Sequence, residues 1–311
     1  MKAFILERLR RSGPLLGLIV LSVALALTTP HFLTVNNILN VLRQVSINAL
    51  IALGMTFVIL TGGIDLSVGS MLALSGALAA GMIHGGVPAA LAVALALFAG
   101  AAMGAANGVL VARGRLAPFI VTLATMTVYR GLTLVYTDGR PITGLGDAFG
   151  VIGRGYLFDL PLPVLWLGLG FAGSYLLLNS TVFGRHVYAV GGNEEAALHS
   201  GVATDRIKIW VYTISGLTAA AGGIILTSRL NSAQPTAGMG YELDAIAAVV
   251  LGGTSLSGGR GTLGGTLVGA LIIGVLNNGL NLLNVSSFYQ QVVKGAVILL
   301  AVLLDRSKAG R

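Results

Sequence analysis

The sequence of 311 residues has no cysteine and little charge. Without cysteine there is no disulfide, no thiolate metal site and no cysteine nucleophile. Asp, Glu, Lys and Arg make up only 10% of the chain, whereas a soluble domain carries roughly 25%. This deficit excludes an ordinary soluble enzyme. It also excludes a nucleic-acid binder, because the charge-rich surface that such a protein needs is missing.

Signatures of catalysis and of metal binding are missing as well. The sequence has no GxxxxGK[ST] phosphate loop, no HExxH and no GxSxG, and its four histidines are not grouped as metal ligands. We therefore expect the chain to catalyse no reaction and to bind no metal ion or cofactor of its own. If it moves a solute against a gradient, the energy must come from an ion gradient or from a partner that hydrolyses ATP.

Hydrophobic residues and glycine are abundant. Hydrophobic residues make up 55% of the chain, 45 residues are glycine, and the mean hydropathy is +0.88. This composition is typical of an all-α integral membrane protein. Runs of roughly 17 to 25 apolar residues predict about ten transmembrane helices. The runs are residues 13–29, 45–61, 66–83, 87–111, 117–136, 161–178, 208–228, 243–258, 262–284 and 288–304. The eighth is short and glycine-rich, which indicates a broken or partial span.

Basic residues predict the orientation of these helices. With the N-terminus inside, thirteen Lys and Arg fall on the cytoplasmic side and four outside, while Arg130 and Lys294 lie within spans. This asymmetry favours ten crossings with both termini cytoplasmic. Residues 1–311 then form a single transmembrane domain with two long connections, an external loop of about 137–160 and a cytoplasmic loop of about 179–207. The first run follows four basic residues, and we expect it to be retained as a span rather than cleaved as a signal peptide.

Glycines repeat at intervals of four residues in two predicted spans. They are Gly100, Gly104 and Gly108, and Gly261, Gly265 and Gly269. This spacing lets helix backbones approach one another closely in lipid, so we expect tight helix packing at both places.

The cytoplasmic loop contains a segment that predicts a turn, a short helix and a glycine stop. Asn193 is a good N-cap, Glu194 and Glu195 are favourable in the first turn, and Gly201 is a good terminator. A capped two-turn helix between spans is typical of a segment that docks into a groove on a soluble partner. An amphipathic connector lying on the membrane surface has the same composition.

The spacing of Glu195, Ala196 and Ala197 before Gly201 resembles the EAA-type coupling motif of ABC importer permeases. The chain is similar to the permeases of monosaccharide ABC importers, and especially to those for ribose. The resemblance extends through residues 61–70, 184–202, 232–255, 276–283 and 289–294. One departure is His199, at a position of the coupling helix where we expect a longer basic or polar side chain, and it bears on the details of docking rather than on the class.

The resemblance implies a permease of the bacterial cytoplasmic membrane that forms a homodimer with ten helices per subunit. Its implied partners are an ATPase subunit inside, which binds ATP and magnesium, and an extracytoplasmic sugar-binding protein outside. The residues that it assigns to ATPase coupling are Arg185, Asn193, Glu194, Glu195, Ala196, Ala197 and Gly201. Ribose, xylose, galactose, arabinose and a signalling furanoside are all carried on this scaffold, so the motifs leave the sugar open.

Polar residues within spans are candidates for the solute path, because they are costly in lipid unless they face protein or water. Asn277, Asn281 and Asn284 share one predicted helix face with Asn278 beside them. Their amides suit neutral sugar hydroxyls, although hydrogen bonds that only lock helices together explain them equally well. Gln291 lies with Gln290 and Lys294 at the outer end of the last span.

The other candidates for the path or its gate are charged. Asp65 and Arg130 are a lone acid and a lone base near or within spans, and a salt bridge between them would satisfy both. The glycines around Asp65 indicate a bend or re-entrant turn that Asp65 or Ser67 caps. The remaining candidates are Tyr241, Glu242 and Asp244, which we expect in an outer loop that meets the binding protein or gates the entrance, or that caps the eighth span.

The alternative to an ATP-driven importer is a secondary transporter or facilitator that works alone through broken helices. Asp65 would then be the only good candidate for an ion site, and the pattern from Glu195 to Gly201 would have no explanation.

Overall fold

The computed structural model describes residues 13–309, which are mostly helical, in agreement with the all-α prediction. The helices of this part of the chain are α2 (Gly13–Thr28), α3 (Val35–Leu60), α4 (Val68–His84), α5 (Ala89–Ala112), α6 (Pro118–Thr137), α7 (Gly146–Arg154), α8 (Leu162–Ser180), α9 (Val182–Gly192), α10 (Glu194–His199), α11 (Thr204–Leu230), α12 (Tyr241–Leu251), α13 (Leu263–Leu282) and α14 (Ser287–Ala309). The strands are β1 (Ile142–Thr143), β2 (Tyr156–Leu157), β3 (Leu160–Pro161) and β4 (Ser232–Ala233).

Every predicted hydrophobic run coincides largely with one of these helices. Within the described residues, six helices are long and apolar enough to cross a membrane, and α2 and α4 are shorter apolar helices. At 1.5 Å per residue, the 11 residues of α12 extend only about 16 Å, roughly half of a hydrocarbon core of about 30 Å. The eighth run is therefore broken, as its glycines indicated, and the count of ten crossings stays a prediction.

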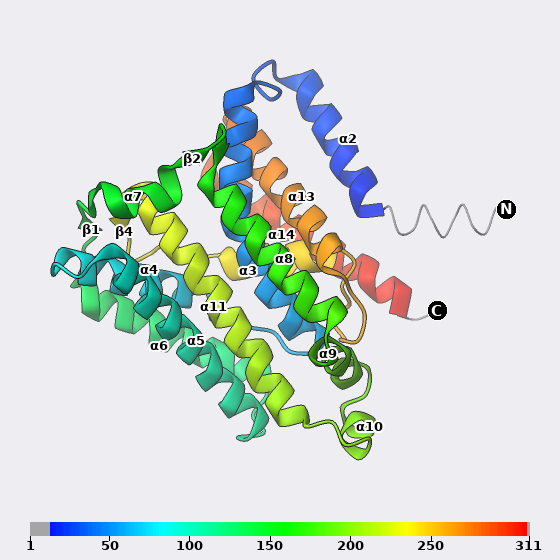
Figure 1. Ribbon diagram of the computed structural model, residues 1–311. Helices are drawn as coiled ribbons and strands as arrows, with labels where there is room; N and C mark the ends of the chain where they lie inside the picture. The colour runs from blue at the N-terminus through cyan, green and yellow to red at the C-terminus, as the bar shows by residue number, and fades with distance from the viewer. Residues whose placement is uncertain (1–12, 310–311) are drawn as a thin grey trace.

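Helix α11 lies at the centre of the molecule and packs on α3, α4 and, most extensively, α5 (Figure 1). Glycines make the contact with α5 close: a Cβ at Gly104 would lie 2.1 Å from the carbonyl oxygen of Tyr212. Gly100 and Gly108 also meet α11, which confirms the first predicted glycine pattern. The second predicted glycine pattern is correct for Gly265 and Gly269, which pack against the end of α12. Gly261 lies before the start of α13 and is not part of the helix.

The two predicted loops lie at different ends of the bundle (Figure 1). The predicted external loop contains β1, α7 and a small hairpin of β2 and β3, and β1 pairs antiparallel with β4. The predicted cytoplasmic loop contains α9 and α10, the two small helices at the bottom of the view. The turn predicted ahead of Asn193 is instead the helix α9, because the Thr181 side chain accepts a hydrogen bond from the Gly184 amide and caps the start of the helix.

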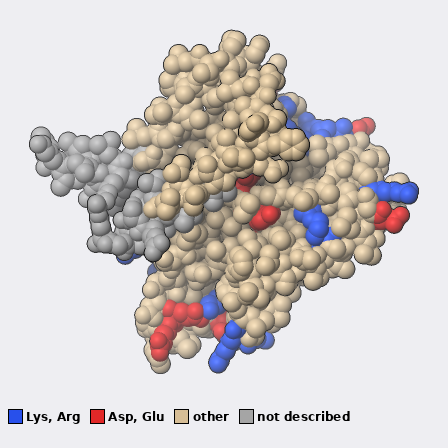
Figure 2. All heavy atoms as spheres, turned by 180° about the vertical axis from the view of Figure 1, so that it is seen from behind, with Lys and Arg blue, Asp and Glu red and all other residues tan. Residues whose placement is uncertain are grey.

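Charged side chains are distributed unevenly over the surface. Figure 2 shows that they gather at the lower end of the molecule and along one edge, whereas the surface between these places is largely uncharged, apart from a few isolated groups. An uncharged band of this kind is expected where helices face lipid, because charge in hydrocarbon is costly.

Candidate functional site

The first candidate site is the short helix α10. The Asn193 side chain accepts a hydrogen bond from the Ala196 amide at 2.9 Å, which makes Asn193 the N-cap. Glu194 and Glu195 occupy the first turn, where carboxylates are favoured by the helix dipole. The chain then reverses at Gly201, whose φ of +84° favours glycine. The predicted cap, first turn and stop are confirmed, and Arg185 lies exposed on the preceding helix α9.

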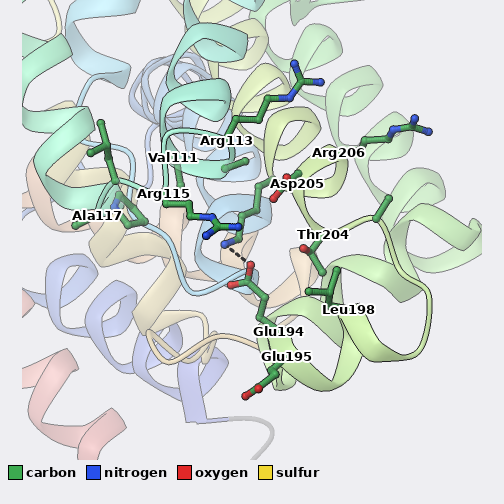
Figure 3. Close-up of a pocket in the computed structure, with 15 residues that line it drawn as sticks. Val111, Arg113, Arg115, Ala117, Glu194, Glu195, Leu198, Thr204, Asp205 and Arg206 are labelled. Atoms are coloured by element: carbon green, nitrogen blue, oxygen red, sulfur yellow. Dashed lines mark ion pairs between the residues drawn. The ribbon is translucent and has the colours of Figure 1, made fainter.

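Helix α10 forms one wall of a cleft of about 990 Å³ at this end of the molecule. The opposite wall is the end of α5 with the connection to α6, and the start of α11 closes the cleft (Figure 3). Glu194 forms an ion pair with Lys208 across the cleft, while Glu195 and Leu198 are exposed. The cleft offers cations, carboxylates and an apolar patch together. Its charged lining residues are Arg113, Arg115, Glu194, Glu195, Asp205, Arg206 and Lys208.

Helix α9 connects α10 to the interior of the bundle. Gly191 packs directly against the end of α3, since a Cβ there would collide with the Leu60 carbonyl oxygen. The same oxygen accepts a hydrogen bond from the Gly259 amide at 2.9 Å, in the loop that follows α12. The Tyr188 hydroxyl donates to the Gly261 carbonyl oxygen at 2.9 Å, and burial raises the pKa of this phenol, which keeps it a neutral donor. Helix α9 therefore links α10 to α3 and to the loop that follows α12 by direct contacts.

The second candidate site is the place where two helices begin inside the molecule. Helices α4 and α12 each follow a non-helical segment, residues 61–67 and 231–240, and their first turns meet. A Cβ at Gly69 would lie 2.3 Å from the Gly238 carbonyl oxygen, and one at Gly238 would lie 2.6 Å from that of Gly69. Irregular backbone at this depth is tolerated where protein or a water-filled cavity satisfies it.

Arg130 of α6 holds this junction together. Its guanidinium donates to the carbonyl oxygens of Pro235 at 2.7 Å, Ala237 at 2.8 Å and Gly69 at 3.3 Å. The salt bridge that would have joined Arg130 to Asp65 is absent from the described residues. Backbone carbonyls satisfy the guanidinium instead, because the non-helical segment 231–240 leaves the Pro235 and Ala237 carbonyls free for a side-chain donor.

Asp65 is fully buried and occupied by hydrogen bonds. Its carboxylate accepts from the Ser67 amide at 3.1 Å, the Ser67 hydroxyl at 2.6 Å and the Ser215 hydroxyl at 2.8 Å. The Ser67 hydroxyl in turn accepts from Asn107 at 2.9 Å. Asp65 thus binds the start of α4 to α11 and, through Ser67, to α5. This arrangement favours the structural role over contact with a solute.

Tyr241, Glu242 and Asp244 form the first turn of α12 inside the molecule, so the structure favours the alternative that places them at the start of the eighth span over an outer loop. The preceding segment, and not the helix, connects to the outer end, because Gly238 and Gly240 adopt positive φ and turn the chain at the junction. Asp244 is only 4% exposed and forms an ion pair with Lys294 at 2.9 Å. Lys294 of α14 is thus bound to the first turn of α12.

The predicted asparagine face is partly correct. Asn278 is buried and exchanges two hydrogen bonds with Asn37 of α3, at 2.8 and 3.0 Å, so it locks the two helices together. The buried Asn277 has no hydrogen-bond partner for its Oδ1 among the described residues. Asn281 is exposed and accepts from Gln290 at 2.8 Å.

Asn284 does not share this face, since α13 ends at Leu282 and Asn284 has a φ of +53°. Gln291, on α14, is exposed.

The apolar helices, the two helices that begin inside the bundle and the cleft at one end define an all-α, polytopic membrane protein of the transport class. The model of the family described as "Branched-chain amino acid transport system / permease component" matches residues 37–302. The chain belongs to this family of permeases.

Curated relatives share nearly its whole length. The chain is 63% identical over 303 residues to the ribose import permease protein RbsC of Bacillus subtilis (strain 168), covering 97% of this chain and 94% of that protein. It is 54% identical over 311 residues to RbsC of Escherichia coli (strain K12), covering 99% and 96%. The L-arabinose ABC transporter permease protein AraH of Azospirillum brasilense is 42% identical over 300 residues, covering 96% and 88%. No solved structure matched the chain.

Proposed function

We propose that this chain is the membrane-spanning permease subunit of an ATP-binding cassette importer that carries ribose inward across the bacterial cytoplasmic membrane. The observation that carries the proposal is the capped helix α10 beside an open cleft, in a chain whose relatives over nearly its full length are named ribose import permeases. The chain is a transport subunit and not an enzyme, and a separate ATPase subunit hydrolyses ATP with magnesium.

Each proposed partner has its own place on the molecule. The ATPase subunit docks in the cleft beside α10, and an extracytoplasmic sugar-binding protein docks on the external loop of about 137–160. A second copy of the permease completes the path, and lipid surrounds the pair. Ten crossings with both termini cytoplasmic remain the topology that the basic residues favour.

Motion of the ATPase reaches the path through packed backbone. Helix α10 follows α9 after the single residue Asn193. Helix α9 lies against the end of α3 and the loop that follows α12, and α12 begins at the junction with α4. The partners drive transport only by binding one arrangement of the bundle more tightly than the other. We infer that the junction is the part whose arrangement changes.

Uptake of labelled ribose tests the proposal. Cells that produce this chain with its ATPase and binding protein are compared with cells lacking either partner, with and without a protonophore. We expect uptake only with both partners, and we expect it to survive the protonophore. Uptake by the chain alone that collapses with the protonophore would instead establish an ion-coupled secondary transporter, with Asp65 as the group to study.

A second experiment tests the docking site. Glu195→Arg combined with Gly201→Glu reverses a charge of α10 and removes its glycine stop, so we expect the ATPase to be lost on co-purification while membrane insertion is retained. Asp147→Arg reverses an exposed acid in α7 and is the matched control, which should retain the ATPase. Equal recovery of the ATPase with both variants would refute docking at α10.

A further inference from the structure

A pocket of about 400 Å³ opens beside the junction of α4 and α12. Ligand pockets in proteins span roughly 300–1,000 Å³, so its size is suitable for a small molecule. It lies between α6 and the first turns of α4 and α12, and it is distinct from the cleft beside α10. Its polar and glycine lining consists of Ser70, Thr127, Arg130, Gly131, Gly240 and Glu242.

The two charged groups of the pocket are held in place. The Arg130 guanidinium is fixed by three backbone carbonyl oxygens, and the Glu242 carboxylate accepts from the Gly240 amide at 3.2 Å. A guanidinium has five N–H donors and a carboxylate about four acceptor positions, so both retain capacity for a ligand. Fixed groups of this kind cost little further ordering when they bind.

The chemistry of the lining selects a neutral, hydroxyl-rich ligand. The Glu242 carboxylate disfavours an anionic ligand, and the Arg130 guanidinium disfavours a cationic one. Neighbouring hydroxyls of a sugar can accept hydrogen bonds from the guanidinium and donate to the carboxylate. The apolar remainder of the wall, Met126, Leu134 and Met239, suits the C–H face of a sugar ring. The pocket thus combines the two kinds of surface that a monosaccharide presents.

The location of the pocket indicates that lipid does not cover it. Gly131, Leu134 and Met239 are exposed on the single chain, so the pocket opens at its surface. Ionisable side chains at such a depth face protein or water and not hydrocarbon. A water-filled path shared with a second permease copy satisfies this requirement.

We propose that this pocket is a transit site where the permease itself binds the sugar, with Arg130 and Glu242 contacting adjacent hydroxyls. The proposal rests on the proposed function for the identity of the sugar. It adds a binding step within the membrane subunit and names the residues that make it.

Filling the pocket at Gly131 is the first test. A Cβ at Gly131 meets no atom within 4 Å, so Gly131→Leu fits the helix and occupies the pocket without a collision at its base. We expect this variant to insert and to bind the ATPase normally but to lose most ribose uptake. Gly168→Leu is the matched control, because Gly168 lies in α8 with equally open surroundings, and it should transport like the unaltered chain. Equal uptake by both variants overturns the proposal.

Protection of a single cysteine is the second test, and it does not depend on transport. Because the chain has no cysteine, Gly131→Cys places one reactive thiol in the pocket of the purified permease. We expect excess ribose to slow its reaction with a small water-soluble methanethiosulfonate, while Asp147→Cys in α7 reacts at an unchanged rate. If ribose does not slow the reaction of Gly131→Cys, the proposed binding of sugar in this pocket is refuted, even if the complete importer transports ribose. Protection without uptake by the complete importer overturns the proposed function and supports the pocket.

Discussion

Asp244 and Lys294 form an ion pair in which the carboxylate is 4% exposed and the ammonium 29% exposed. Lys294→Met removes the cation and leaves an uncompensated buried charge, which costs roughly 3 kcal/mol or more. We expect a lower thermal unfolding temperature for the purified permease. Adding Asp244→Asn to Lys294→Met should recover part of the loss, because the buried charge is then gone.

The ion pair of Lys208 and Glu194 provides the control, because its carboxylate is 46% exposed. Such a pair contributes about 0–1 kcal/mol, so Lys208→Met should leave the unfolding temperature nearly unchanged. Equal destabilisation by Lys208→Met and Lys294→Met would show that burial does not decide the cost.

Individual roles were predictable where the cause is local. Asn193 as a cap and Gly201 as a stop follow from short-range geometry, and both are confirmed. The partners of Arg130 were not predictable, because they are backbone carbonyls of Gly69 and of the segment before α12. A sequence contains no signal for a carbonyl that a break in a helix leaves free.

At the scale of elements, the six residues of α10 depend on their cap, since so short a helix is marginal by itself. Asn193→Ala removes the acceptor for the Ala196 amide, at a cost of about 1 kcal/mol. We expect weaker co-purification of the ATPase and slower uptake. Asn193→Asp keeps an acceptor and adds charge that the helix dipole favours, so it should behave like the unaltered chain. If the Asn193→Ala variant co-purified with the ATPase as well as the unaltered chain does, the cap would be dispensable for docking.

The contact between α5 and α11 makes a second prediction about elements. Gly104→Ala places a Cβ against the backbone of Tyr212, where a separation of 2.1 Å forces the helices apart. We expect a loss of roughly 1–3 kcal/mol in thermal unfolding. Gly168→Ala, with nothing within 4 Å, should instead be neutral or gain up to about 1 kcal/mol in helix propensity. A stabilised Gly104→Ala variant would contradict the packing described here.

The elements themselves were largely predictable, since each of the ten apolar runs overlaps one helix. The weak point was also visible, because glycines in the eighth run indicated the break after α12. The contact between the starts of α4 and α12 could not be predicted, because it joins segments that lie far apart in the chain and share no periodic pattern. The helix α9 was missed because three glycines at its ends resemble turn signals.

At the scale of the whole molecule, the charged surface and the junction of α4 and α12 lie in different places. Charged surface suited to soluble partners gathers at the lower end of the molecule and along one edge, and the largely uncharged surface between these places suits lipid (Figure 2). The backbone of α9, which leads into α10, packs against the end of α3 and the loop that follows α12. Because α12 begins at the junction with α4, this packing links the end of the molecule that carries the cleft to the junction through α12.

The orientation of the whole molecule makes the last prediction. Because the chain has no cysteine, single cysteines report which side each loop faces. Asp147→Cys in α7 should react with a membrane-impermeant maleimide in intact cells, since it lies in the predicted external loop. His199→Cys in α10 should react only after the membrane is permeabilised, since basic residues are retained in the cytoplasm. The reverse pattern would place α10 outside, where no ATPase can reach it, and would refute both the topology and the docking site.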